Sequence, residues 1–334
     1  ANYKLTTEGG LKKGAEPMEI VTRFERIPTR IAETAEEGAI RVADEMAATI
    51  RAKAAAGENC VLALTAGKSP IGVYRELVRK HKSEGLSFKN VVIFTLFEFY
   101  PIAADEQQSY TYSLYEELIN QVDIPAAQVH TLDGTVAAER VSEYCKEYEA
   151  AIQAAGGIDI LLLGMGDQGQ VALNEAGTYQ NTRTRIVALS NASRKLVASS
   201  FYGIENVPTR ALTVGIATIM QAKRIILIGW GEDKSEVAVK VIEGAVDAAV
   251  PASYLQNHAN AEVVLDEDAA SGLTRVATPW LVGSCVWTNR FIRKAVLWLC
   301  RKVDKPILKV TYQDYIDNSL GQLIEETGLT YDKI

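Results

Sequence analysis

The feature of the sequence that most constrains its fold is an alternation of short, continuous apolar runs with amphipathic stretches of helical length. The apolar runs lie at 60–64, 91–96, 158–163, 186–189, 211–214, 224–228 and 262–265. Runs rich in Leu, Ile and Val without polar alternation are what strands buried on both faces require. Stretches with helical spacing lie between them, at 71–81, 109–121, 137–155 and 234–243. The alternation predicts βαβ units and therefore a three-layer α/β/α, doubly wound, mostly parallel sheet.

One main domain of Rossmann-like architecture is predicted over residues 30–283, because no linker rich in Pro, Gly or Ser divides the alternation. Residues 1–29 are polar and predict an extended N-terminal arm. Apolar residues near helical spacing predict the first helix from about residue 31 to residue 56.

The pattern changes after residue 283, and a C-terminal helical appendage is predicted over 284–334. It holds one amphipathic helix over 288–302 and a second, more polar one over 312–327. Phe291, Ala295 and Leu299 recur at helical spacing in the first of these. Because an apolar face left in water is a liability, we expect this helix to pack onto the main domain through them.

Composition excludes several classes of protein. The net charge of −7 repels nucleic acid and anionic membranes. No apolar stretch approaches the ~18 residues of a membrane span, and the first residues show no signal-peptide pattern. Four widely spaced cysteines without a CxxC pair suit buried thiols in a reducing cytoplasm, and three isolated histidines offer little for a metal site. We therefore expect a cytoplasmic protein with no metal, nucleic-acid or membrane partner.

A candidate anion site follows the first apolar run. Gly67 permits a tight turn there, Ser69 can cap the helix that follows, and Pro70 suits its first position. The free N–H groups at this helix start would converge on an anion, and Lys68 would add a full charge. A plain helix start with a solvent-facing lysine is the competing interpretation.

A glycine-rich turn follows a later strand, and Gly164, Gly166 and Gly169 formally match the GxGxxG dinucleotide fingerprint. The match is weak because residues 171–180 are a poor helix and no acid follows the next strand to hold a ribose. A dinucleotide-dependent oxidoreductase is therefore a minority interpretation.

Taken together, several short motifs resemble the glucosamine-6-phosphate deaminase family over residues 30–283. They are the loop before Pro70, Ser87-Phe88-Lys89-Asn90-Val91-Val92, Ser109-Tyr110, Val122-Asp123-Ile124-Pro125, the glycine-rich turn, Asn174-Glu175, Arg183-Thr184-Arg185 and Ala211-Leu212-Thr213-Val214-Gly215. The sister lactonases of 6-phosphogluconate share the glycine-rich turn, but Asn174-Glu175 fits the deaminases better. The arm and appendage resemble a longer bacterial branch of the family.

The resemblance implies the same α/β/α fold and a sugar 6-phosphate ligand. The family reaction opens the sugar ring, moves a proton from C2 to C1 and expels ammonia, without a metal or organic cofactor. A carboxylate base must reach both carbons, and a histidine oriented by acids must shuttle a proton to the ring oxygen. The longer branch implies a deacetylase-like domain downstream, and a homo-oligomer is left open.

The chain departs from the family at the catalytic positions. Phe97 stands where the family has the aspartate base, and Gln168 and Gln170 stand where it has the Asp and His of the glycine-rich turn. Glutamine cannot exchange a proton near neutral pH. Glu175 matches the family's catalytic glutamate. Glu98 could replace the base only if the backbone turns there, because in a strand it points to the opposite face from Phe97.

The residues expected to bind the sugar phosphate match the family better than the catalytic ones do. Gly67 and Ser69 match the family's phosphate loop, and Lys234 matches its phosphate-contacting lysine. Arg194 is the nearest stand-in for a family arginine, and Asn174 is retained beside Glu175. The predicted phosphate site comprises Gly67, Lys68 and Ser69 with Lys234 closing it from another turn.

Two functions within the family remain open. The first is a hexose or hexosamine 6-phosphate-binding protein of amino-sugar metabolism with lost or much reduced deaminase activity. The second is an active sugar-phosphate isomerase or deaminase that uses Glu98 and Glu175.

Overall fold

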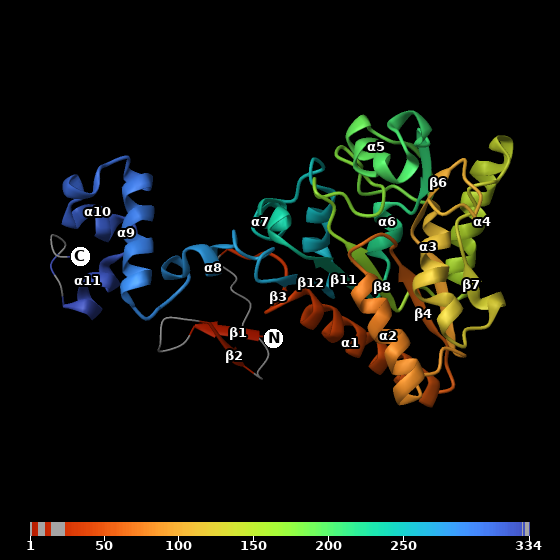
Figure 1. Cartoon of the computed structure of the whole chain (residues 1–334), viewed down its shortest axis with the longest axis horizontal. Coiled ribbons are helices and arrows are strands. Elements are labelled where there is room, and N and C mark those ends of the chain that lie inside the picture. Colours follow the sequence, from red (N-terminus) through yellow and green to blue (C-terminus); the bar gives the residue numbers. More distant parts are fainter. Residues whose placement is uncertain (1, 6–10, 15–23, 329, 331–333) are drawn as a thin grey trace.

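The centre of the molecule is a seven-stranded sheet in which every strand pair is parallel, seen in a computed structural model that describes residues 2–5, 11–14, 24–328, 330 and 334 (Figure 1). The strand order is β3-β12-β11-β8-β4-β5-β7. In chain order the strands are β3 (Thr29–Ala32), β4 (Cys60–Leu64), β5 (Val91–Thr95), β7 (Val129–His130), β8 (Ile160–Gly164), β11 (Arg224–Gly229) and β12 (Ala261–Asp266). The predicted fold class is confirmed.

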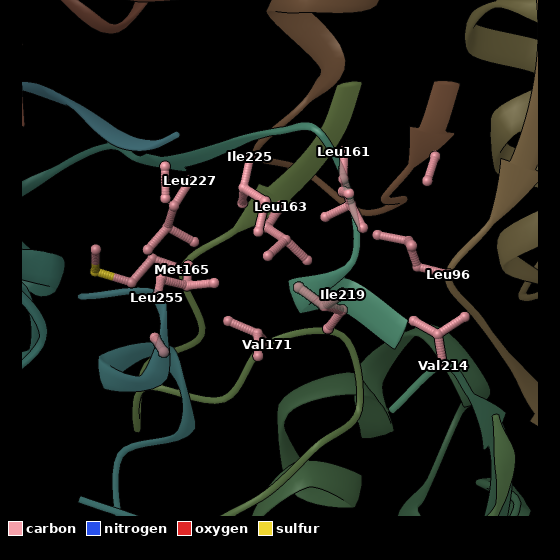
Figure 2. Packing of buried hydrophobic residues seen from close by; sticks show 14 of the residues in the cluster. Leu96, Leu161, Leu163, Met165, Val171, Val214, Ile219, Ile225, Leu227 and Leu255 are labelled. Atoms are coloured by element: carbon pink, nitrogen blue, oxygen red, sulfur yellow. The ribbon is translucent and has the colours of Figure 1, made fainter. Parts of the chain in front are cut away.

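Helices cover both faces of this sheet, which makes three layers. One face is covered by α1 (Ala35–Ala55) and α2 (Ile71–Glu84), and the other by α4 (Val141–Ala154), α6 (Ile216–Met220) and α7 (Ser235–Ile242). Neighbouring strand residues enter different apolar cores, as Leu161 and Leu162 of β8 do. Figure 2 shows Leu161 and Leu163 of β8 packed near Ile219 of α6. Burial of both faces explains why these strands have no polar alternation.

A second sheet is antiparallel and contains two of the apolar runs that were predicted to join the parallel sheet. Its order is β6 (Phe97–Tyr100), β10 (Arg210–Thr213) and β9 (Arg185–Ala188). The runs at 186–189 and 211–214 are strands as predicted, but they pair in this separate sheet. Strand β6 was not predicted, because only Leu96 separates it from β5 and the apolar run continues through the turn. The short helix α3 (Tyr110–Glu117) follows β6, and α5 (Asn191–Val197) follows β9.

The N-terminal region is more structured than an extended arm. Strands β1 (Asn2–Leu5) and β2 (Leu11–Gly14) pair antiparallel, while 6–10 and 15–23 lie outside the described residues. Ile31, where the first helix was expected to begin, instead lies in edge strand β3 opposite Leu265. Helix α1 begins at Ala35, because the Thr34 hydroxyl accepts a hydrogen bond from the Glu37 N–H at 3.1 Å.

The C-terminal helices form a cluster with its own core. They are α9 (Asn289–Val303), α10 (Tyr312–Asp317) and α11 (Gly321–Thr327), and they lie together at one end of the molecule, beyond the short helix α8 (Thr274–Ala277) (Figure 1). Ala295 and Leu299 are fully buried, but their cluster contains Trp280, Tyr315 and residues of these helices. Helix α9 thus meets the predicted main domain at its end, through Trp280, and the described residues of this cluster include none from the central sheet. In the part of the chain that the structure describes, no helix is long and apolar enough to cross a membrane.

Candidate sugar-phosphate site

The predicted phosphate loop connects β4 to α2. Gly67 has a φ of +105°, a backbone conformation that residues other than glycine rarely adopt. Ser69 was expected to cap α2, with Pro70 at its first position, and this prediction is wrong. Pro70 occupies the N-cap position, and no side chain among the described residues caps the helix. The first turn of α2 also lacks an acidic residue. The positive end of this helix is therefore open to an anion.

The second turn that meets this loop carries Lys234. A cavity of about 770 Å³ is lined by Gly67, Lys68 and Ser69 on one side and by Lys234 on the other, so the predicted phosphate residues do come together. The Lys234 ammonium forms an ion pair with Asp167 of the glycine-rich turn. Lys68 is exposed and has no ion pair among the described residues. The partner Asp167, which the sequence analysis did not identify, partly neutralises the cavity.

A smaller cavity of about 190 Å³ continues from the first and contains the catalytic positions. Phe97, Tyr110 and Gln170 line it, and Tyr110 and Gln170 line the larger cavity as well. The Phe97 side chain is 7% exposed and meets the Tyr110 ring edge to face. Burial raises the pKa of Tyr110 well above its usual value, so its hydroxyl stays protonated at neutral pH. A hydrocarbon ring thus occupies the position at which the resemblance implies a carboxylate.

Two backbone N–H groups of the glycine-rich turn donate hydrogen bonds to Gln170. The Gly166 N–H donates to the Gln170 carbonyl at 3.2 Å, and the Gln168 N–H donates to the Gln170 side-chain oxygen at 2.9 Å. Gln170 faces both cavities, whereas Gln168 is exposed. The first helix after this turn is α5, which begins only at Asn191. The turn therefore lacks the crossover helix that a dinucleotide fingerprint requires, which argues against the oxidoreductase interpretation.

Glu98 is held away from the reacting position. It is 1% exposed, and its carboxylate accepts hydrogen bonds from the Ser109 hydroxyl at 2.6 Å and the Thr111 N–H at 2.9 Å. The N–H groups of Tyr110 and Phe99 also donate to it. A carboxylate that four donors surround at the start of α3 is a structural anchor for that helix. This geometry supports a structural role for Glu98 and gives no support to the hypothesis that it replaces the missing base.

Glu175 anchors the start of α5. Its carboxylate accepts from the Ser190 N–H at 3.2 Å and from the Ser190 hydroxyl at 3.1 Å, and it also accepts from the Ser193 hydroxyl. Leu196 and Val197 at the other end of α5 line both cavities. Glu175 therefore positions a wall of the site.

Asn174 and Arg194, which were expected to bind the ligand, form hydrogen bonds within the protein. Asn174 is fully buried, and its amide donates to the Val171 and Val214 carbonyls while its oxygen accepts from Arg185. One Arg194 nitrogen donates to the Ile204 carbonyl at 2.7 Å and to the Val207 carbonyl at 3.0 Å. Neither side chain lines the two cavities.

Three histidines lie in the described part of the chain, and none lines either cavity. His81 contacts the Leu86 carbonyl, and His258 contacts the Ala222 carbonyl. His130 stacks on Phe94, and burial lowers its pKa below the usual value. Among the described residues no group of three or more His, Cys, Asp or Glu side chains could hold a metal ion.

Trp230 is a site residue that the sequence analysis missed. It follows β11, lines the larger cavity, and donates its indole N–H to the Ser69 carbonyl at 2.9 Å. A Cβ at position 38 would lie 2.6 Å from the Trp230 ring, so glycine there makes room for it. The available signal was a lone tryptophan at the carboxyl end of a central strand, where open α/β sheets bind ligands.

Comparison with known proteins places this geometry in context. Residues 33–265 match the family described as glucosamine-6-phosphate isomerases/6-phosphogluconolactonase. A protein of Bacteroides thetaiotaomicron named as glucosamine-6-phosphate deaminase-like is 47% identical over 313 residues, which are 94% of this chain. The chain spans about half (47%) of that relative's length. A glucosamine-6-phosphate deaminase of Corynebacterium urealyticum is 43% identical over 69% of this chain and 88% of its own.

Solved structures agree with these sequence matches. A monomeric glucosamine-6-phosphate deaminase superposes with a TM-score of 0.70 at 34% identity, over 74% of this chain and 100% of its own. The 6-phosphogluconolactonase of Trypanosoma brucei gives a TM-score of 0.61 at 18% identity, over 75% of this chain and 99% of its own, and so shares the fold.

Proposed function

Because the chain belongs to the glucosamine-6-phosphate isomerase/6-phosphogluconolactonase family, we propose that it binds a hexose or hexosamine 6-phosphate and has lost most or all deaminase activity. The observation that carries the proposal is Phe97, a buried ring in the cavity at the position of the family's base. Binding and the loss of turnover rest on different residues, so separate measurements test them.

Binding is supported by the phosphate end of the site. The open N-terminus of α2, Lys68 and Lys234 all face one cavity, and each favours an anion. Hydroxyl and amide side chains that could bond sugar hydroxyls also line it: Gln107, Gln108, Ser109, Ser113, Gln170, Ser199 and Ser200. A cavity with aromatic walls and a few polar groups is typical of small-molecule sites.

Loss of turnover is supported by the groups that face the sugar end. Phe97 cannot accept a proton, and Gln170 cannot exchange one at neutral pH. Each proton-transfer group contributes about 10²–10⁴-fold to a rate, so losing both should remove several orders of magnitude. Glu98 and Glu175 do not replace them, since both carboxylates are already bonded at helix starts.

The test measures binding and turnover on the same protein. Glucosamine 6-phosphate should raise the melting temperature of the wild type, whereas glucosamine without phosphate should not. Lys234→Met should weaken the shift, and Glu232→Gln in the same turn should leave it unchanged, because Glu232 is exposed and outside the cavity lining.

Turnover is followed as ammonia release coupled to formation of fructose 6-phosphate. We expect none above background. A turnover of even about 1 s⁻¹, ordinary for an enzyme, would contradict the loss of activity. Glu98→Gln and Glu175→Gln would then show which carboxylate acts as the base.

A further inference from the structure

A second cavity also meets the phosphate loop. It has a volume of about 660 Å³ and lies between α1 and α2, with Ala39, Ile40, Arg75 and Trp230 among its lining residues. Lys68 and Ser69 of the phosphate loop line this groove and the sugar-side cavity alike. A phosphate bound at the loop therefore lies where the two spaces meet, and the groove offers room for a group attached to that phosphate.

The charges around the loop suit a phosphate with only one negative charge. The charged residues lining the larger sugar-side cavity are two lysines, Lys68 and Lys234, and two aspartates, Asp167 and Asp233, so their formal charges cancel. A phosphate monoester carries about −1.5 to −2 at pH 7, because its second pKa is near 6. A phosphodiester has no second proton to lose and carries a single charge. The ion pair between Lys234 and Asp167 therefore weakens the preference for a monoester dianion.

The groove also has the chemistry to hold the second group. The half-buried Trp230 ring is fixed by its hydrogen bond to the Ser69 carbonyl at 2.9 Å and by close packing over Gly38. Ile40 and Ala39 add an apolar surface beside it. Arg75 is exposed at the groove and has no ion pair or hydrogen bond among the described residues. An aromatic or apolar group can lie on this surface, beside the Arg75 side chain.

We propose that the ligand is a phosphodiester: a hexose or hexosamine 6-phosphate whose phosphate also carries an aromatic or apolar group, which lies in the groove between α1 and α2. The proposal rests on the proposed function, because the sugar and its phosphate occupy the site described above. It goes further in naming a ligand class that the monoester deaminases would not be expected to favour.

The experiment compares two probes by calorimetric titration: glucosamine 6-phosphate and its phenyl diester, in which a phenyl group esterifies the phosphate. The diester should bind the wild type about tenfold more tightly. Ile40→Trp fills the groove and should abolish this advantage while leaving the affinity for the monoester unchanged. Ala48→Trp, on an exposed position of α1 outside the groove, is the matched control and should retain the advantage.

Each other outcome has a distinct meaning. If the monoester binds and the diester binds equally or more weakly, the phosphodiester inference is overturned while the proposed function stands. If the diester advantage survives Ile40→Trp, the second group does not occupy the groove and the inference fails. If neither probe binds at millimolar concentration, the proposed function fails, and the inference fails with it.

Discussion

The rings of Phe97 and Tyr110 meet edge to face, with centroids 4.5 Å apart and planes at 83°. Phe99 stacks on the same Tyr110 ring with centroids 4.7 Å apart. Three aromatic rings from β6 and α3 therefore form one wall of the site. Such pairs stabilise packing by about 0.5–1.5 kcal/mol beyond the area they bury. Phe97 is thus part of a packed aromatic cluster.

We expect Phe97→Asp to destabilise the fold by roughly 3 kcal/mol, because it places an unpaired carboxylate among these rings. Urea denaturation at pH 7 measures the change. Phe97→Leu keeps an apolar side chain and should cost less, about 1.5 kcal/mol or below. The loss in the aspartate variant should shrink at low pH, where the carboxyl is protonated. Equal stability of the two variants at pH 7 would show that position 97 is well hydrated.

Catalysis should return only when the base and the shuttle are restored together. The triple variant Phe97→Asp, Gln168→Asp and Gln170→His should release ammonia from glucosamine 6-phosphate measurably above wild type. Phe97→Asp alone should do little, because ring opening would still lack its proton shuttle. Circular dichroism must first show that the triple variant is folded. A folded, ligand-binding triple variant without activity would show that further positions are needed.

The pair between Lys234 and Asp167 should hold down phosphate affinity. Asp167→Asn removes the acid that competes for the Lys234 charge, and glucosamine 6-phosphate should then bind about five- to tenfold more tightly, on the order of 1 kcal/mol. Titration calorimetry at low salt measures this gain, which should fall as ionic strength rises. Glu232→Asn, an exposed acid outside the cavity, controls for net charge. Equal gains from both variants would assign the effect to overall charge.

The parallel sheet could be predicted from sequence because its strands have a strong local signature. Leu161 and Leu162 face different cores, so both must be apolar, and the same holds along β4 and β11. The antiparallel sheet could not, because the pairing of β6 with β10 joins Glu98 to Leu212, more than a hundred residues apart. Nothing near either strand encodes that pairing.

The site shows the same division between local and long-range information. Gly67 and Lys68 were found because a strand, a turn and a helix start are adjacent in sequence. Asn174 and Arg194 were given binding roles because they lie at or near family positions, yet they donate hydrogen bonds to the carbonyls of Val214 and Val207. A polar residue that satisfies distant backbone groups looks the same in sequence as one that binds a ligand.

The C-terminal helices should unfold separately from the sheet domain, because their buried residues form a cluster of their own around Trp280. Leu299→Ala should destabilise this cluster by about 2–5 kcal/mol. Differential scanning calorimetry should show two transitions, only one of which shifts. Leu297→Ala, on the exposed side of the same helix, is the matched control and should change little. A single transition shifted by Leu299→Ala would show that the two cores unfold together.

A buried pair at the start of the sheet domain should make stability depend on pH. Glu25 is 4% exposed and lies 3.0 Å from the Arg275 guanidinium. Burial raises the pKa of Glu25 from 4.5 to about 7, although Arg275 opposes the shift. The folded state therefore holds this proton more tightly than the unfolded state, so its contribution to stability is complete below pH 4.5 and is lost as pH rises through about 7.

The variant Glu25→Gln has no such proton. The free energy of unfolding of the wild type, measured relative to this variant, should fall by up to roughly 3 kcal/mol between pH 4.5 and 8. Because the histidines are the same in both proteins, their contribution to the pH dependence is removed by this subtraction. A difference in unfolding free energy that stays flat or rises with pH would show that Arg275 keeps Glu25 ionised.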